Sequence, residues 1–297
     1  GIRACRDCGL MLTSPRPSPA AISSYYPGDY QPFHAPHLPS DRQTVTSALK
    51  RVVRRLLDPK EHVLPRGIVP GRALEVGCGS GRQLTELAAA GWKVEGLEPS
   101  AETAARLRKE SKFPVTTGTI EETSFEKKSF DLIVALMVLE HLHDPLECLS
   151  RIHSWLRPGG FLTGSVPNAA SWEFRFFKEK WFALQVPTHL FHFTPRTLEQ
   201  TLVASGFCNV EIYQQRNVNN LMVHLGWLLS RRQLPGAKTC LSYPERGSWL
   251  LRYSLRPAAS VLAWMQQAGR ITFIAQRSGG DRPLDDRSLA LTDLAKR

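Results

Sequence analysis

The chain has 297 residues, of which 42% are apolar and 22% are charged, as is ordinary for a globular protein with a sizeable core. No uninterrupted apolar run reaches the roughly 18 residues of a membrane-spanning helix, so the sequence predicts no membrane span. The formal net charge of +11 suits phosphate-bearing ligands, nucleic acid or an anionic membrane. It can equally belong to a solvated face.

The six cysteines do not form the pattern of a disulfide framework, because only Cys5 and Cys8 lie close together in the sequence. This argues against a disulfide-stapled secreted domain and predicts a cytoplasmic protein. No signal peptide is visible. The chain starts at Gly1 directly before the cysteine pair, so we expect that a segment upstream of it is missing.

The first 70 residues predict an N-terminal extension. Residues 1–40 are rich in Pro, Tyr and Ser and show little periodicity. Residues 43–57 repeat apolar side chains at helical spacing, with lysine and arginine on the other face, and predict an amphipathic helix. Prolines and glycines at 59–71 mark the boundary that follows.

From residue 72 the chain alternates strand and helix patterns. The strands are expected at 72–76, 93–97, 115–117, 130–136 and 161–166. The helices between them are expected at 83–90, 101–109 and 145–156. A helix at 195–205, a strand at 207–213 and a late strand at 271–276 follow. Repeated βα units predict an α/β protein with a parallel, doubly wound sheet, and the polar residues 278–297 predict a mobile tail.

A glycine-rich loop follows the first of these strands. Gly77, Gly79 and Gly81 occupy alternate positions before the next helix. Glycine lets the backbone turn tightly and approach a ligand closely. The spacing differs from the dinucleotide fingerprint, because Arg82 stands where the last glycine would fall. Glu75 can meet the cationic end of a ligand, although the loop alone also fits a simple tight turn.

Glu98 ends the second strand, roughly 20 residues after the glycine loop, where doubly wound folds place a ribose-binding acid. A carboxylate at that position can accept two hydrogen bonds from a ribose diol. The alternative is a solvated acid at the end of a strand. Because ligands bind at the carboxyl ends of the strands in such folds, the position favours the binding role.

Five ordered features carry a resemblance to a known family: residues 74–81, Glu98, 129–133, 138–142 and 156–160. They resemble those of class I S-adenosylmethionine-dependent methyltransferases, most closely the bacterial group that includes ubiquinone-biosynthesis-type O-methyltransferases. The resemblance implies a Rossmann-like sheet of seven strands, with 271–276 as the last, antiparallel strand. The methyltransferase domain would then comprise residues 71–216 and 270–277.

The resemblance implies S-adenosylmethionine as the cofactor. The residues that would cradle its amino-acid moiety are Glu75, Gly77, Gly79 and Gly81, and Glu98 would bind its ribose. The adenine would be edged by Thr119, Ile120 or Glu121, which come just after the third strand. Thr119 stands where the family typically has an acid, and Glu121 is the substitute. Leu136 and Met137 would lie near the reactive methyl group.

The segment 187–194 resembles an active-site loop of the same group. Methyl transfer to an oxygen needs alignment and removal of a proton, and histidine suits the second task near neutral pH. His189 and His141 are the candidate bases. His189 can alternatively be a loop histidine bonded to backbone, and His141 can simply start a helix. Some relatives hold a divalent metal here, but Met137 replaces one of their acids, so we expect no metal.

Cys5 and Cys8, followed by Gly9, resemble one knuckle of a zinc ribbon. A structural zinc needs four ligands, and His34 and His37 are the nearest other candidates. In relatives with a run like that at 25–30, a second cysteine pair lies upstream. The pair therefore binds metal only if such a pair precedes this chain, and otherwise represents two free thiols.

Residues 217–269 form a helical insertion where the family has a short hairpin. The apolar runs 221–229 and 261–265, with 249–251 between them, are flanked by arginines and tryptophans. Such flanks are typical of interfacial helices. We expect a helical cap that shields the acceptor site and touches a membrane carrying a lipid-linked substrate. The alternative is a helical pair packed on the sheet or on a second subunit.

The sequence thus predicts methyl transfer to a small-molecule or lipid-linked acceptor, with oxygen as the expected acceptor atom and carbon or nitrogen as the alternatives. The proline-aromatic motif of DNA amino-methyltransferases is missing at 135–138, and no basic-aromatic pattern appears, so we expect no specific nucleic-acid partner. Two alternatives stay open. One is an NAD-linked oxidoreductase or sugar-nucleotide enzyme on a similar sheet, and the other is a non-catalytic scaffold with a methyltransferase-like fold.

Overall fold

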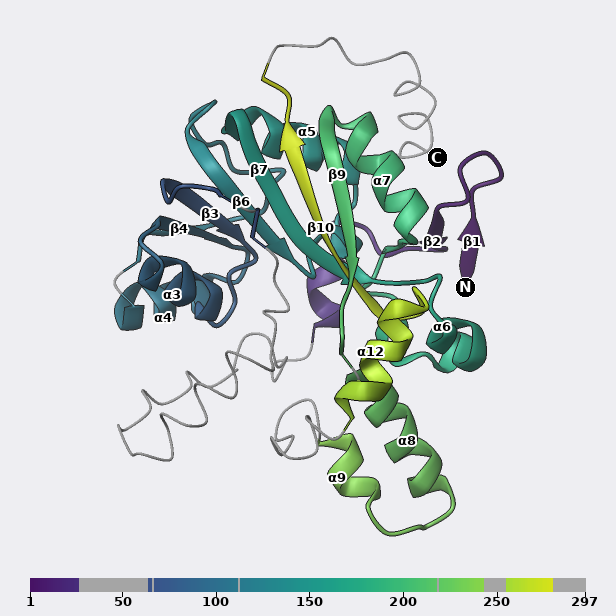
Figure 1. The fold of residues 1–297 in the computed structure, drawn as a ribbon. Coiled ribbons are helices and arrows are strands. Elements are labelled where there is room, and N and C mark those ends of the chain that lie inside the picture. The colour runs from purple at the N-terminus through teal and green to yellow at the C-terminus, as the bar shows by residue number, and fades with distance from the viewer. Residues whose placement is uncertain (27–63, 66, 112, 218, 243–254, 280–297) are drawn as a thin grey trace.

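The computed structural model describes residues 1–26, 64–65, 67–111, 113–217, 219–242 and 255–279 (Figure 1). Several expectations fall outside these residues: the amphipathic helix at 43–57, the apolar run at 249–251, His34 and His37, and most of the tail at 278–297. None of the helices that the structure describes is long and apolar enough to cross a membrane.

A seven-stranded sheet forms the centre of the molecule, in the order β5-β4-β3-β6-β7-β10-β9 (Figure 1). Its strands are β3 (Arg72–Val76), β4 (Lys93–Glu98), β5 (Val115–Thr117), β6 (Phe130–Leu136), β7 (Leu156–Pro167), β9 (Phe207–Gln214) and β10 (Arg270–Arg277). Strands β3 to β7 pair in parallel, and β10 is antiparallel to both β7 and β9. The predicted doubly wound sheet with an antiparallel last strand is therefore confirmed.

Helices cover both faces of this sheet, because successive side chains of a strand point to opposite faces. On β6, Leu132 and Val134 pack with α3 and α4, whereas Ile133 and Ala135 pack with α5 and α7. The helices are α3 (Arg82–Ala89), α4 (Ala101–Ser111), α5 (Pro145–Trp155) and α7 (Pro195–Ala204). This arrangement leaves the carboxyl ends of the parallel strands free to build a site.

The starts of α5 and α7 show why the chain turns into helices there. Asp144 Oδ1 accepts the Glu147 backbone N–H at 3.0 Å and thereby caps α5, at the start expected from the sequence. Thr194 and Thr197 form a reciprocal capping box, and a proline follows each cap. The strand expected from residue 161 is longer in the structure: β7 begins at Leu156, its register against β6 is irregular between Leu156 and Phe161, and Gly159 in this stretch has a φ angle of 80°.

A second, three-stranded antiparallel sheet has the order β1-β2-β8. Its strands are β1 (Ile2–Ala4), β2 (Met11–Thr13) and β8 (Phe191–His192). Thr13 Oγ1 donates to the His189 carbonyl at 2.7 Å, and the Thr13 N–H donates to the Leu190 carbonyl at 2.9 Å. The N-terminal hairpin therefore holds the segment that carries His189.

In the described residues between β9 and β10, three helices form an arm below the sheet in Figure 1: α8 (Asn219–Arg231), α9 (Ala237–Leu241) and α12 (Arg256–Trp264). Their buried centre contains Met222, Cys240 and Ala259. The remaining short helices are η1 (Ile22–Tyr25), η2 (Leu139–His141), α6 (Trp172–Phe177), η3 (Lys178–Lys180) and η4 (Phe182–Leu184). The helical insertion before the last strand is thus present where the sequence predicts it.

Burial of His192 on β8 makes a testable contribution to stability. Its Nε2 atom lies 3.1 Å from Thr13 Oγ1, and burial lowers its pKa to about 4. An unfolded histidine has a pKa of about 6.5, so the unfolded state binds more protons between pH 6.5 and 4. The contribution of neutral His192 to the free energy of unfolding therefore falls as the pH is lowered through this window.

The free energy of unfolding, measured with urea, should accordingly depend less on pH in His192→Gln than in the parent. Between pH 6.5 and 4 it should fall by about 3 kcal/mol less in the variant. Thr13→Val is the matched control, because it removes the hydrogen bond but keeps the titrating ring. That control should unfold more easily at every pH with the parent's slope. Equal slopes for His192→Gln and the parent would contradict the assignment.

Candidate active site

The glycine-rich loop connects β3 to α3 and adopts a backbone that favours glycine. Gly77, Gly79 and Gly81 have φ angles of 68°, 46° and 72°, all in the left-handed region. At Gly81 an added Cβ would also lie 2.6 Å from a methyl carbon of Leu107. The Gly77 N–H donates to the Leu97 carbonyl at 2.8 Å, which ties the loop to β4. The tight turn predicted from the sequence is confirmed.

Glu98 lies at the end of β4 and contacts this loop directly. Its Oε2 accepts the Gly79 N–H at 2.9 Å, and its Oε1 accepts the Ser100 N–H at 3.0 Å. Burial raises the pKa of Glu98, and these two N–H groups oppose that rise. A carboxylate oxygen has two acceptor sites, so each oxygen of Glu98 can still accept a hydroxyl group.

Glu75 is buried on β3, directly before the glycine loop. Within the described part of the chain, no hydrogen bond reaches its Oε2 atom. Burial is the main cause that raises the pKa of Glu75 well above its usual value, and the Leu84 backbone N–H acts against it. A buried carboxyl oxygen without a partner is costly, and a cationic ligand group would satisfy it. The residues present therefore fit a ligand with a cationic end and a ribose.

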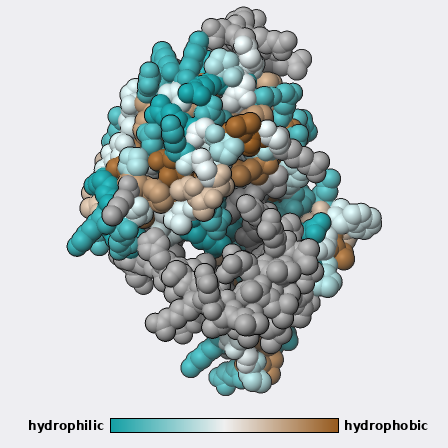
Figure 2. Space-filling model, turned by 60° about the vertical axis from the view of Figure 1, so that its left-hand side comes forward, coloured by the Kyte–Doolittle hydropathy of each residue, from teal (hydrophilic) through white to brown (hydrophobic). Residues whose placement is uncertain are grey.

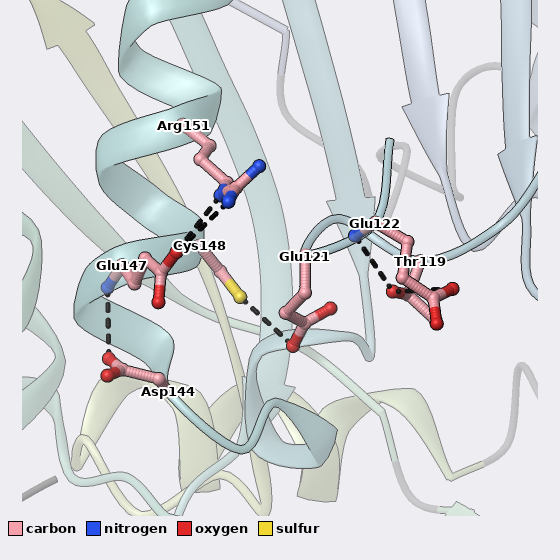
Figure 3. Close-up of polar contacts among 7 residues, drawn as sticks. All are labelled: Thr119, Glu121, Glu122, Asp144, Glu147, Cys148 and Arg151. Carbon is pink, nitrogen blue, oxygen red and sulfur yellow. Dashed lines mark hydrogen bonds and ion pairs between the residues drawn. The ribbon is translucent and has the colours of Figure 1, made fainter. Parts of the chain in front are cut away.

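The residues expected at the adenine follow β5, and two of them, Thr119 and Glu121, are shown in Figure 3. Thr119 Oγ1 donates to Glu122 at 3.3 Å within a turn, and Glu121 Oε1 accepts the Cys148 thiol at 3.2 Å. Ile120 is 2% exposed and lies in the main buried cluster of the sheet. Thr119 and Glu121 are half-buried. Their role in binding the adenine base of the cofactor stays a prediction.

Leu136 ends β6, and Met137 follows it with an unusual backbone. Met137 has a φ angle of 55°, which is rare for a residue with a side chain, and its N–H donates to the Ser165 carbonyl at 2.8 Å. Such conformations persist where the surrounding structure enforces them, and they gather at functional sites. The position at the carboxyl end of a central strand agrees with the role expected for both residues.

The structure brings His189 and His141 together from distant segments. Their ring centroids lie 4.6 Å apart, edge to face. His189 Nδ1 lies 2.8 Å from the Ala183 carbonyl, and His141 Nδ1 lies 3.0 Å from the Thr188 carbonyl. Because a carbonyl only accepts, both Nδ1 atoms carry the proton and both Nε2 atoms keep a lone pair. Burial lowers the pKa of His141 to about 4 and that of His189 well below its usual value, so both rings are neutral at pH 7.

Glu140 completes a group that we call the histidine cluster: Glu140, His141 and His189. One ligand atom from each residue lies within 4.8 Å of the others, so these residues could hold a metal ion, which the sequence did not predict. Neither carboxyl oxygen of Glu140 has a hydrogen-bond partner among the described residues. Burial raises the pKa of Glu140 to about 8. Burial therefore favours the protonated form of Glu140 at neutral pH when no ligand is bound.

Tyr26 is a residue that the sequence-based interpretation missed. Its hydroxyl lies 3.0 Å from His141 Nδ1, although 115 positions separate the two residues. The only signal was its place in the aromatic run at 25–30.

Cys5 and Cys8 lie in the turn between β1 and β2, where the Cys8 backbone N–H lowers the pKa of Cys5. No third metal ligand joins them within the described ranges, so zinc binding stays a prediction.

Comparison with known proteins places this chain in a family. A family model described as "Methyltransferase domain" matches residues 44–212, which is more than half of the chain. A ubiquinone biosynthesis O-methyltransferase from Methylocella silvestris is 31% identical over 123 residues, which cover 40% of this chain and 48% of that protein. A probable S-adenosylmethionine-dependent methyltransferase from Mycolicibacterium smegmatis is 34% identical over 98 residues, covering 32% of this chain and 37% of that protein.

The chain thus spans about half or less of the length of the curated relatives that it matches. Among solved structures, a methyltransferase described as a possible histamine N-methyltransferase from Thermotoga maritima aligns with a TM-score of 0.49 and 18% identity. That alignment covers 71% of this chain and 84% of the other. On the match over residues 44–212, the chain belongs to the methyltransferase domain family.

Proposed function

We propose that this chain transfers a methyl group from S-adenosylmethionine to an oxygen atom of a small-molecule or lipid-linked acceptor. The observation that carries the proposal is Glu75, whose buried Oε2 atom lacks a partner beside a glycine loop that Glu98 braces. Membership of the methyltransferase family supports the reaction class. The names of the matched relatives, O-methyltransferases among them, support the cofactor and the acceptor atom.

Each part of the cofactor has a proposed partner in this chain. Bound S-adenosylmethionine supplies an electrophilic methyl group on a sulfonium. Glu75 would hold the ammonium group, since a buried carboxylate gains most from a cation. Glu98 would accept the ribose hydroxyls with the free acceptor sites of its two oxygens. The residues proposed for the adenine are Thr119, Ile120 and Glu121, and those proposed beside the methyl group are Leu136 and Met137.

The histidine cluster would remove the proton of the acceptor hydroxyl. The Nε2 atom of neutral His189 keeps a lone pair and can take this proton. His189 alone is a weak base, because burial disfavours its charged form. Ionised Glu140, whose ligand atom lies within 4.8 Å of that of His189, would offset that cost by stabilising the imidazolium through its charge. The chain would therefore act as a methyltransferase that supplies alignment and a base.

Isothermal titration calorimetry tests the proposal. S-adenosylhomocysteine should bind the full chain, and NAD should not. Mass spectrometry of extracts incubated with the protein and isotopically labelled S-adenosylmethionine should then reveal a labelled product. Binding of NAD instead of S-adenosylhomocysteine would favour an oxidoreductase, and binding without a labelled product in any extract would favour a scaffold. Repeating the assay with EDTA distinguishes a histidine base from a mechanism that depends on a bound metal ion. EDTA should stop only the metal-dependent reaction.

A further inference from the structure

The arm exposes an apolar stripe on α12. Val261, Trp264 and Met265 are 53%, 84% and 54% exposed. Their spacing of three and four residues places them on one face of the helix. Ala259 on the other side is buried against Met222 of α8. The buried centre of the arm is therefore formed by other apolar side chains. Among the described residues, Val261, Trp264 and Met265 do not contribute to it.

Helix α6 extends this apolar surface. Trp172 and Phe176 are 40% and 63% exposed, and their rings stack with centroids 5.2 Å apart. Arg175 of α6 donates a hydrogen bond to Gln267, two residues after Met265. This bond ties α6 to the end of α12, and the two helices lie side by side in Figure 1.

The far end of α8 exposes further apolar residues: Leu225, Trp227, Leu228 and Leu234. In Figure 2 the lower tip of the molecule shows hydrophobic and hydrophilic atoms next to one another. We call the exposed apolar residues of α6, α8 and α12, together with Leu234, the arm surface. Several exposed apolar side chains of this size on neighbouring helices indicate an interaction site rather than scattered surface residues.

The charges beside the arm surface are almost all positive. In residues 219–242 and 255–269 the charged side chains are Arg231, Arg232, Lys238 and Arg256, and no Asp or Glu occurs there. On α6 and η3, Arg175, Lys178 and Lys180 add positive charge, against the single exposed acid Glu179. Two such surfaces would repel one another, so the charge favours an anionic partner over a second copy of the chain.

We propose that the arm surface docks on an anionic lipid bilayer. Tryptophan and the stems of Lys and Arg suit the boundary between headgroups and acyl chains, where one end of the side chain is apolar and the other is hydrated. Apolar side chains enter that boundary while the cations pair with lipid phosphates. Because no described helix can span a bilayer, the contact is peripheral.

The arm also contacts the loop that holds the proposed base. His224 of α8 accepts the Phe182 N–H through Nε2 at 2.9 Å, and the next residue, Ala183, accepts His189 Nδ1 at 2.8 Å. Docking would thus hold a bilayer next to the loop of His189. Such a position favours a methyl acceptor that is carried by the membrane. This consequence rests on the proposed function, whereas the docking itself does not depend on it.

Vesicle flotation tests the docking. The full chain should rise with vesicles of phosphatidylcholine and phosphatidylglycerol at low salt, and stay at the bottom with phosphatidylcholine alone or at high salt. The triple variant Val261→Ser, Trp264→Ser and Met265→Ser should lose at least about tenfold in bound fraction. Val203→Ser is the matched control, because Val203 is 54% exposed on α7, outside the arm, and it should float like the parent.

Two further measurements keep the result clear. Binding of S-adenosylhomocysteine by the triple variant at the parent's affinity would show that the fold is intact, so its loss of flotation would support the docking. If the parent floats with the vesicles but does not bind S-adenosylhomocysteine, the docking proposal stands and the proposed function is rejected. A parent that stays at the bottom with anionic vesicles at low salt overturns the docking. The docking is also overturned if light scattering shows that the parent is a dimer and the triple variant a monomer, while neither protein floats with the vesicles.

Discussion

Glu98→Ala should weaken the binding of S-adenosylhomocysteine by roughly 30- to 700-fold. Two charge-assisted hydrogen bonds to the ribose contribute about 2 to 4 kcal/mol, and each 1.4 kcal/mol is tenfold in affinity. The substitution also removes the acceptor for the Gly79 N–H at 2.9 Å, so the glycine loop loses its brace. Isothermal titration calorimetry measures the affinity directly.

Glu95→Ala is the matched control for this experiment. Glu95 lies three residues earlier on the same strand, and its carboxylate pairs with Arg72 at 2.7 Å on a half-exposed surface. Its removal should cost little stability and leave the affinity unchanged, because exposed ion pairs contribute weakly. If Glu98→Ala binds S-adenosylhomocysteine as tightly as the parent while remaining folded, the ribose assignment is wrong.

His189→Ala should lower kcat by about a hundredfold or more, because the acceptor would lose its general base. The affinity for S-adenosylhomocysteine should barely change, since His189 belongs to the loop that would face the acceptor. His143→Ala is the matched control: its Nε2 lies 3.1 Å from the Pro17 carbonyl, outside the histidine cluster. Steady-state kinetics should show parent-like turnover for that control, and equal losses in the two variants would indicate structural damage rather than a lost base.

The pH profile separates a base from a positioning residue. Burial raises the pKa of Glu140 to about 8, so its carboxylate forms as the pH rises through that value. Since the carboxylate would stabilise the imidazolium of His189, kcat/KM should increase with pH across about 8. Glu140→Gln should lose this increase and keep a flat, low rate. A parent profile without a change near pH 8 would remove Glu140 from the mechanism.

The order of strands and helices could be predicted from the sequence because the signals are local. Apolar residues alternate with the period of a buried strand or recur with that of a helix, and the caps Asp144 and Thr194 stand at the predicted starts. Boundaries follow less directly from the sequence: β7 begins at Leu156 and not at residue 161, because Leu156 pairs with Phe130 of β6 ahead of an irregular stretch.

The glycine loop and Glu98 could also be predicted, for a topological reason. Residues at the carboxyl ends of neighbouring parallel strands meet at one edge of the sheet, so two local signals combine into one site. β3 and β4 are such neighbours, and the Gly79 N–H indeed lies 2.9 Å from Glu98. What the sequence did not reveal is that Glu98 also braces the loop, since that depends on the direction of a side chain.

Only the tertiary structure assembled the histidine cluster and its surroundings. Thr13, Tyr26, Glu140 and His189 come from segments far apart in the chain, and no periodic pattern links them. The strand that anchors the loop, β8, has two residues, too few to show a period. By itself the sequence determined the sheet and the glycine loop, because local periodicity and parallel topology determine both. The protonation of Glu140 and of the histidines depends on burial, which arises only when these distant segments pack together.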